Sequence, residues 1–296
     1  MAILVDEKTR ILIQGITGRE ASMVLKDMLA YGSNVVAGVT PGKGGQTVEG
    51  IPVYNSVKEA LDHHPGINTT LVYVPPFAVK SAAFEALGNG IPLLNIITER
   101  VPVQDTWEIL KKAKLCNARI VGPTSLGIIS PGKCKLGPIG GKESSAVYMK
   151  GTIGVLSKSG GMTTETSWVL RLAGFGQSTA LGLGGDVLMG SIFSDLIPLF
   201  NEDKQTKGIV LFGELGGLQE NAVAQYVKEH GMPKPIVAFI AGKFTEHLPQ
   251  AIFGHAGAII HGGNDTPGAK IRELEKAGVR VAKVHHEIPK LLKEML

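Results

Sequence analysis

The sequence of 296 residues is poor in aromatic residues, cysteines and long apolar runs. Aromatic residues make up 5% of the chain, so the sequence does not indicate a surface of rings on which nucleic-acid bases stack. Two cysteines, Cys116 and Cys134, are too few for a disulfide framework and are typical of a reducing compartment. No apolar run approaches the ~20 residues of a membrane span, and charges within the first ten residues argue against a secretory signal. We expect a cytoplasmic protein with no membrane contact.

The charge balance does not indicate a strongly acidic binding partner. The chain has 30 Lys and Arg residues against 26 Asp and Glu, a net charge of +4, and no basic block stands out. Bulk electrostatics therefore gives no reason to expect nucleic-acid binding. Glycine, by contrast, is abundant, with 39 residues, about twice the average usage of ~7%. Many tight turns and close backbone approaches follow from that abundance.

Short β-branched runs alternate with helical patterns along the whole chain. In the first half, the patterns predict strands at 9–16, 34–40, 68–74, 93–98 and 119–122, and helices at 20–31, 57–63, 78–87 and 104–114. In the second half, they predict strands at 151–157, 178–184, 208–214, 235–241, 257–261 and 279–284, and helices at 163–173, 191–201, 219–229, 269–277 and from 288. Near-continuous apolar strands separated by helices predict parallel sheets covered on both faces.

The alternation breaks at 122–150, a stretch rich in Gly, Pro and Ser that carries no sustained period. Such a composition is typical of a connection between domains. The chain is thus expected to be an α/β protein of two doubly wound domains, divided near Gly122.

The first candidate site is QGITGREA, residues 14–21, between a strand and a helix. Gly15 and Gly18 allow a sharp turn, and the helix start offers unpaired N–H groups to a phosphate. The dinucleotide fingerprint has a third glycine where this chain has Ala21, and an acid near the position of Lys43. A lysine there suits a ligand with an extra phosphate near its ribose, as coenzyme A has. A turn that binds nothing is the alternative.

Two further motifs lie at strand ends in the second half. Ser159-Gly160-Gly161 opens a helix, so hydroxyls and bare amides can hold an anion there, although a simple N-cap is the alternative. Glu214 ends an apolar strand, where a carboxylate can accept the ring N–H of a histidine and raise its basicity. A helix cap or an exposed acid is the alternative for Glu214.

His255 stands in GHAGAII, between small residues that leave its ring open to a bulky reactant. It is either a structural histidine or an acceptor for a phosphoryl group. The remaining histidines of the second half have no comparable setting and are expected on the surface or in loops: His247, His261, His285 and His286. No His, Cys or Asp pair has the spacing of metal ligands, so no metal site is predicted.

In this order, the motifs resemble the α subunit of succinate–CoA ligase over essentially the whole chain. They are QGITG, GVTPGKGG, a VPP strand end, ITE, SKSGG, GLGGD, GELGG and GHAGAII. The resemblance implies a Rossmann-like CoA-binding domain, residues 1–124, and a flavodoxin-like ligase domain, residues 125–296, that carries a phosphohistidine. It also implies a β subunit with an ATP-grasp domain, in a heterodimer or heterotetramer, which binds ATP or GTP with Mg.

The resemblance assigns roles position by position. His255 matches the phosphorylated histidine and Glu214 the carboxylate that orients it. The helix start that receives the phosphoryl group corresponds to Ser157, Ser159, Gly160 and Gly161. Contacts to CoA are implied for Thr17, Gly18, Arg19, Glu20, Lys43, Ile97, Thr98 and Glu99. The implied activity is the formation of an acyl-CoA thioester through a phosphohistidine and an acyl phosphate.

Some departures bear on the carboxylate substrate. Ser125 replaces a cysteine of the succinate enzymes, Thr164 replaces a tyrosine that shapes their pocket, and their basic stretch before GHAGA becomes LPQAIF. These features lean towards the ATP-citrate lyase branch, so we favour citrate, as in the small subunit of a citryl-CoA synthetase, narrowly over succinate. A non-catalytic CoA-binding regulatory protein and an NAD-dependent dehydrogenase are alternatives; the latter is weakened by Ala21 and Lys43.

Overall fold

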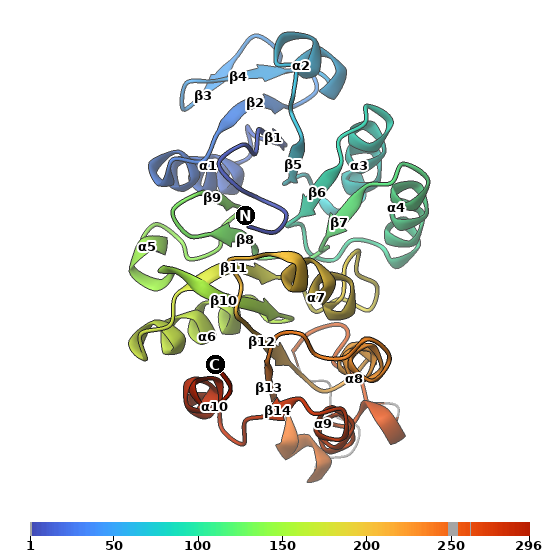
Figure 1. Cartoon of the computed structure of the whole chain (residues 1–296). Coiled ribbons are helices and arrows are strands. Elements are labelled where there is room, and N and C mark those ends of the chain that lie inside the picture. The colour runs from blue at the N-terminus through green and yellow to red at the C-terminus, as the bar shows by residue number, and fades with distance from the viewer. Residues whose placement is uncertain (1, 248–253, 261) are drawn as a thin grey trace.

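The computed structural model describes residues 2–247, 254–260 and 262–296. Its strands form two seven-stranded sheets, which follow one another along the long axis of the molecule (Figure 1). The α/β fold class expected from the alternating pattern is confirmed.

The first sheet has the strand order of a Rossmann fold. Strand β1 (Ile11–Gln14) lies between β2 (Val35–Val39) and β5 (Thr69–Val72), all parallel. Counted along the chain, the six parallel strands take the order 3-2-1-4-5-6, which places the switch point between β1 and β5. The remaining strands are β3 (Thr47–Val48), β4 (Ile51–Tyr54), β6 (Leu93–Ile96) and β7 (Arg119–Val121), of which β3 pairs antiparallel with β4.

Helices cover both faces of this sheet (Figure 1). They are α1 (Arg19–Tyr31), α2 (Val57–His63), η1 (Pro76–Ala78), α3 (Val79–Gly88) and α4 (Val103–Leu115). Helix α1 buries Ala21, Val24, Leu25 and Met28, a spacing that forms one apolar stripe. On the other face, α3 and α4 pack against each other and over β5, β6 and β7.

The second sheet has the flavodoxin-like order. Its five parallel strands run 2-1-3-4-5 in chain order, so the switch point lies between β10 (Lys150–Ser157) and β12 (Gly208–Gly213). The other parallel strands are β11 (Gln177–Gly182), β13 (Ile236–Ile240) and β14 (Arg280–Val281). Two antiparallel strands, β8 (Gly127–Ser130) and β9 (Cys134–Leu136), extend the sheet beyond β11.

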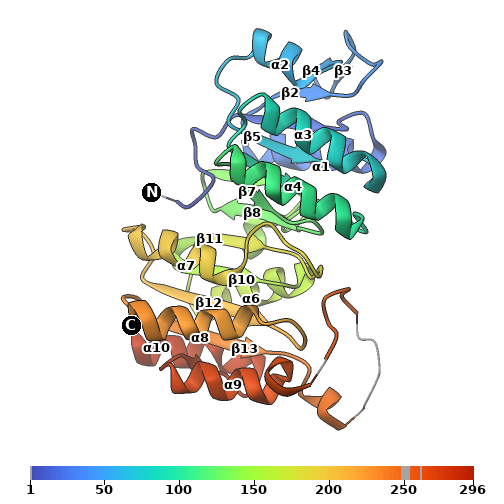
Figure 2. The same ribbon diagram turned by 90° about the vertical axis from the view of Figure 1, so that its right-hand side faces the viewer.

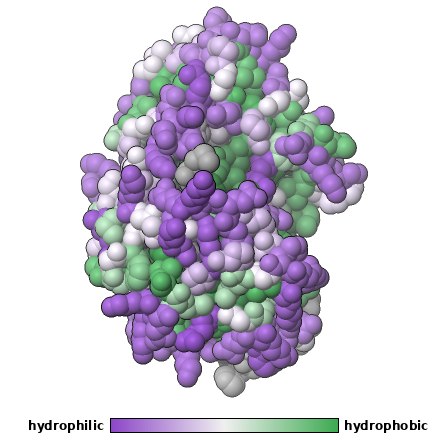
Figure 3. All heavy atoms as spheres, viewed as in Figure 1, coloured by the Kyte–Doolittle hydropathy of each residue, from purple (hydrophilic) through white to green (hydrophobic). Residues whose placement is uncertain are grey.

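Helices flank this sheet as well (Figure 2). They are α5 (Ser144–Val147), α6 (Gly160–Leu172), α7 (Phe193–Glu202), α8 (Gln219–His230), η2 (Lys243–His247), η3 (Gly263–Asp265), α9 (Pro267–Lys276), η4 (His285–Glu287) and α10 (Ile288–Met295). Helices α6 and α10 pack on one face, and α7, α8 and α9 on the other. In the view of Figure 3 the surface is mostly hydrophilic, with hydrophobic residues in separate groups. Within the described residues, no helix combines the length and apolar character needed to cross a membrane.

Two sequence-based expectations need correction. The stretch 122–150, interpreted as a connection, supplies β8 and β9, which were missed because they are short and flanked by glycines. The strand expected at 257–261 is wrong, as far as Ile260; His261 lies outside the described residues. Ala258 is buried, but Ile259 is exposed, and the Ala258 N–H bonds the His255 carbonyl rather than a neighbouring strand. An apolar run after a glycine-rich turn therefore folded as coil.

The two sheets share a buried seam. The hydroxyl of Ser33, just after α1, donates to the Lys135 carbonyl in β9 and accepts from its N–H, at 2.7 and 2.9 Å. One hydrophobic cluster contains Leu25 and Met28 of α1 together with Leu136 of β9. We keep a division at residue 124 as a proposal, since it falls between the last strand of the first sheet and the first of the second.

Candidate active site

The switch point of the second sheet collects the groups expected to do chemistry. Ser159 follows β10, Gly185 follows β11, and Glu214 follows β12, all at the carboxyl ends of parallel strands. In open α/β sheets ligands bind at this edge. The turn that carries His255 lies here too, because the Gly257 N–H donates to the Gly185 carbonyl at 2.8 Å.

His255 and Glu214 form a close pair. The ring Nδ1 of His255 lies 2.9 Å from both Oε1 and Oε2 of Glu214. Because a carboxylate only accepts hydrogen bonds, Nδ1 carries the proton and Nε2 keeps its lone pair in the neutral ring. The His255 side chain is 33% exposed, so a reactant can reach it. The hydrogen bond to Glu214 raises the pKa of His255, and this outweighs the opposing effect of burial.

Gly185 lies directly against the imidazole ring of His255. A Cβ atom at this position would lie 2.6 Å from Nδ1 of His255 and closer still to Cγ, so only glycine leaves room for the ring. The next residue, Asp186, accepts a hydrogen bond from the Thr124 hydroxyl at 2.6 Å. Its negative charge also favours the protonated form of His255.

The start of helix α6 faces the same cavity as His255. Ser159 is the N-cap, with its hydroxyl accepting from the Met162 N–H at 3.4 Å. A cavity of about 580 Å³ is lined by Ser159, Gly160 and Gly161 on one side and by Gly254, His255 and Ala256 on another. Amides at a helix start and a positive dipole end suit a phosphoryl group.

Three hydroxyl residues of the predicted site make hydrogen bonds within the protein itself. Ser157 is buried, and its hydroxyl donates to the Ser159 carbonyl while accepting from the Ser159 N–H. The Thr164 hydroxyl pairs with the Tyr148 hydroxyl at 3.2 Å. Neither Ser157 nor Thr164 is among the residues that line the His255 cavity. Ser125 does line it, but its hydroxyl donates to the Gly182 carbonyl and accepts from the Gly127 N–H.

The residues with implied CoA contacts follow the carboxyl ends of parallel strands of the first sheet. Thr17, Gly18, Arg19 and Glu20 follow β1, Lys43 follows β2, and Ile97, Thr98 and Glu99 follow β6. Gly18 caps α1 without any side-chain hydrogen bond, so the first amides of this helix are open to a phosphate. At Gly15 a Cβ would lie 2.8 Å from the Tyr73 carbonyl, which keeps this turn narrow.

Hydrogen bonds hold the loop that follows β2, and its lysine points outward. The side-chain oxygen of Asn55 accepts from the N–H groups of Gly42 and Gly44, and the Lys43 side chain is exposed. In contrast, the Thr98 hydroxyl is bonded to the Val74 carbonyl. Ile97 and Glu99 also line the cavity that contains His255. The turn that follows β6 therefore forms part of the wall of the His255 cavity, and the open start of α1 and the exposed Lys43 suit the phosphates of CoA.

Sequence reasoning missed a buried charge cluster behind Glu214. The Glu220 carboxylate pairs with Lys158 at 3.0 Å and Lys270 at 2.6 Å, and it accepts the Glu214 N–H. Lys270 also donates to the Glu214 carbonyl at 2.7 Å, so both main-chain polar groups of Glu214 are hydrogen-bonded. Burial would raise the pKa of Glu220, but the two ammonium groups lower it below the ordinary value. Lys158 stands inside SKSGG, and this interruption of an otherwise small, uncharged motif was the available signal.

The other histidines take different places. His285 is half-buried, with its Nε2 2.9 Å from the Thr166 hydroxyl and its ring against Phe212 and Phe239, so it is more than a surface residue. His286 is exposed, as expected. The His247 side chain and His261 lie outside the described residues.

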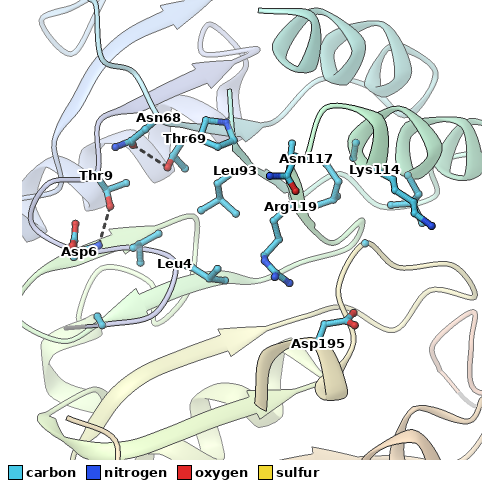
Figure 4. A pocket seen from close by; sticks show the side chains of 18 residues that line it. Leu4, Asp6, Thr9, Asn68, Thr69, Leu93, Lys114, Asn117, Arg119 and Asp195 are labelled. Carbon is cyan, nitrogen blue, oxygen red and sulfur yellow. Dashed lines mark hydrogen bonds between the residues drawn. The ribbon is translucent and has the colours of Figure 1, made fainter. Parts of the chain in front are cut away.

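Two larger cavities do not have His255 in their lining. One, of about 790 Å³, lies at the amino ends of β5, β6 and β7, where Arg119 and Asp195 come from opposite sides of the seam (Figure 4). The other, of about 770 Å³, has the apolar residues Val187, Leu218 and Ile259 in its lining and also includes Glu214. The smaller cavity with His255 remains the candidate site, since it alone of the three joins the histidine to a helix start.

Comparisons with known proteins match a different family model to each half of the chain. A family model described as "CoA binding domain" matches residues 6–100, and one described as "CoA-ligase" matches residues 156–280. The α subunit of ADP-forming succinate–CoA ligase from Aquifex aeolicus is 45% identical, over 99% of this chain and 95% of its own length. The ADP-forming sulfoacetate-CoA ligase subunit SqwL from an Acholeplasma species is 44% identical, over 100% of this chain and 98% of its own.

Among solved structures, ATP citrate lyase from Methanothrix soehngenii, in complex with citrate and coenzyme A, is similar with a TM-score of 0.91 and 25% identity. The likeness covers 99% of this chain but 50% of that one, so the chain spans about half of the lyase.

Proposed function

The chain belongs to the family of α subunits of ADP-forming acid–CoA ligases, and from this membership we propose that it activates a di- or tricarboxylate through a phosphohistidine on His255. The observation that carries the proposal is the His255–Glu214 pair beside the start of α6. An accessible nucleophile, a carboxylate that fixes its tautomer and a helix start for the phosphoryl group are what such a transfer requires.

Each step assigns a task to residues of this chain. The Nε2 lone pair of His255 attacks the γ-phosphorus of the nucleotide, and the bond to the nucleoside diphosphate breaks. Glu214 stabilises the imidazolium character that develops, and the amides of Gly160 and Gly161 hold the phosphoryl oxygens. A substrate carboxylate oxygen then takes the phosphoryl group from Nε2, which leaves an acyl phosphate. CoA supplies the thiol that displaces phosphate from it.

We propose that this chain works with a β subunit that holds the nucleotide and Mg, with ATP as the donor. The relatives named above, which are subunits of ADP-forming ligases, support both points. In the first domain, Thr17–Glu20 and Lys43 bind the phosphates of CoA, and Ile97–Glu99 guide its thiol arm towards His255. The exposed, uncapped start of α1 supports this placement.

For the acid we favour citrate over succinate. The likeness to ATP citrate lyase supports it. Thr164 does not support this preference, because its hydroxyl pairs with the Tyr148 hydroxyl and it is not among the residues that line the cavity. The test is CoA-dependent ADP release by the purified α/β complex with citrate, succinate and sulfoacetate as parallel substrates. The highest kcat/KM is expected for citrate, and clearly faster turnover of succinate would remove the preference.

The phosphorylation rate should rise with pH. Only the neutral imidazole has a free lone pair on Nε2, and Glu214 raises the pKa of His255 above its ordinary value of 6.5. Phosphohistidine formation from ATP is therefore expected to be slow at mildly acidic pH and to reach half its maximum above pH 6.5. In Glu214→Gln the midpoint should move to lower pH, and the plateau should fall about tenfold or more because the ring is less well oriented. A midpoint unchanged in that variant would show that Glu214 does not set the titration of His255.

A further inference from the structure

Arg100 occupies a backbone conformation that favours glycine. It follows strand β6 and the turn Ile97–Glu99, and its φ is 58°. A non-glycine residue is strained in the left-handed region, so a long side chain is a poor choice for stability alone. Its presence suggests that the guanidinium has a task.

The guanidinium of Arg100 is available to a ligand. Arg100 is exposed and lines the 580 Å³ cavity together with His255 and Ser159. Among the described residues, Arg100 makes no hydrogen bond or ion pair. The other charged groups of the cavity differ: Lys158 is paired with Glu220, and Asp186 accepts from Thr124. Glu99, next to Arg100, is exposed.

The proposed reaction brings a phosphoryl group, CoA and the acid substrate to this cavity. Of these three, the acid suits Arg100 best. The phosphoryl group on His255 has the start of α6 for its charge. CoA presents its uncharged thiol end to the histidine, with its phosphates far away over the first sheet. The acid carries one carboxylate that is activated and at least one further anionic group. A planar guanidinium binds such a group through two parallel hydrogen bonds.

We propose that Arg100 binds the anionic group of the acid that is not activated, and that it thereby restricts the enzyme to acids with two or more anionic groups. The inference rests on the proposed function, and it holds for a carboxylate or a sulfonate at that position. It makes Arg100 a specificity determinant that reads the remote end of the substrate while His255 serves the reacting end.

The variant Arg100→Gly tests this with little risk to the fold, because glycine suits φ = 58°. In the α/β complex, KM for citrate and for succinate should each rise at least about tenfold. KM for CoA and the rate of phosphohistidine formation from ATP should stay unchanged. The preference for succinate over propionate, which lacks the second carboxylate, should fall by the same factor. Arg100→Lys should recover part of the loss, because it restores the charge without the planar fork.

The matched control is Asn117→Gly, since Asn117 also has a left-handed backbone, with φ = 51°, but lies in the seam cavity away from His255. It should leave every constant unchanged. A rise in KM for CoA alone would overturn the proposal in favour of a CoA contact, and unchanged KM values for the acids would overturn it outright. If the wild-type complex formed no phosphohistidine, the proposed function would fail; citrate binding measured by calorimetry would then decide, and equal affinity in Arg100→Gly would overturn the inference.

Discussion

Replacing His255 with asparagine should abolish thioester formation, with turnover of the α/β complex falling about ten-thousand-fold or more. The amide has no nucleophilic lone pair comparable to that of the imidazole Nε2, so no phosphoryl group can be held between the nucleotide and the acid. Incubation with γ-labelled ATP should put acid-labile, base-stable phosphate on the wild-type chain and none on His255→Asn.

CoA binding should survive this substitution. The turns that follow β1 and β2 belong to the first sheet, whereas His255 lies beside the switch point of the second. Calorimetry should therefore give the same affinity for CoA in both proteins. The control is His286→Asn, an exposed histidine, which should turn over normally. If His255→Asn still made thioester, another residue would be the phosphoryl acceptor. An unlabelled wild-type complex would instead favour the alternative of a CoA-binding regulatory protein.

The fold was largely predictable because its parallel strands are buried on both faces and read as apolar runs. Strand β12 is buried at every position, and its pattern alone identified it. The run after His255 looked similar in sequence, yet Ile259 is exposed and the backbone bonds within its own turn. The same apolar composition occurs in a buried strand and in a surface loop. Only the segments that pack against each run distinguish the two cases.

The pairing of His255 with Glu214 was predicted from the family resemblance, and both residues lie at the carboxyl edge of one parallel sheet. The hydroxyl assignments were harder. Ser157 is the last residue of β10, and its hydroxyl bonds the Ser159 main chain, whereas Ser159 lies beyond the strand and caps α6. The ion pairs of Glu220 with Lys158 and with Lys270 join positions 62 and 50 residues apart, and no local pattern indicates such contacts.

The substitution Gly185→Ala should lower the rate of His255 phosphorylation about a hundredfold, although position 185 carries no reactive group. An added methyl would lie 2.6 Å from Nδ1, so the ring must leave its position and the 2.9 Å hydrogen bonds to Glu214 are lost. A shift of about 1 Å at a reacting centre can cost a factor of ~10². The displaced ring also loses the carboxylate that raises its pKa, so the remaining activity should have its pH midpoint at a lower value.

Two comparisons separate this steric effect from a general loss of stability. Gly88→Ala, at the end of α3, adds a methyl that would have no atom within 4 Å apart from its chain neighbours and the backbone of its own helix, and it should leave both labelling and CoA affinity unchanged. In Gly185→Ala, CoA affinity should also be unchanged while labelling is slow, because the altered position belongs to the second sheet alone. Labelling at the wild-type rate would mean that the ring works from a different position, and that the contact between His255 and Gly185 is not the geometry in which the phosphoryl group is transferred.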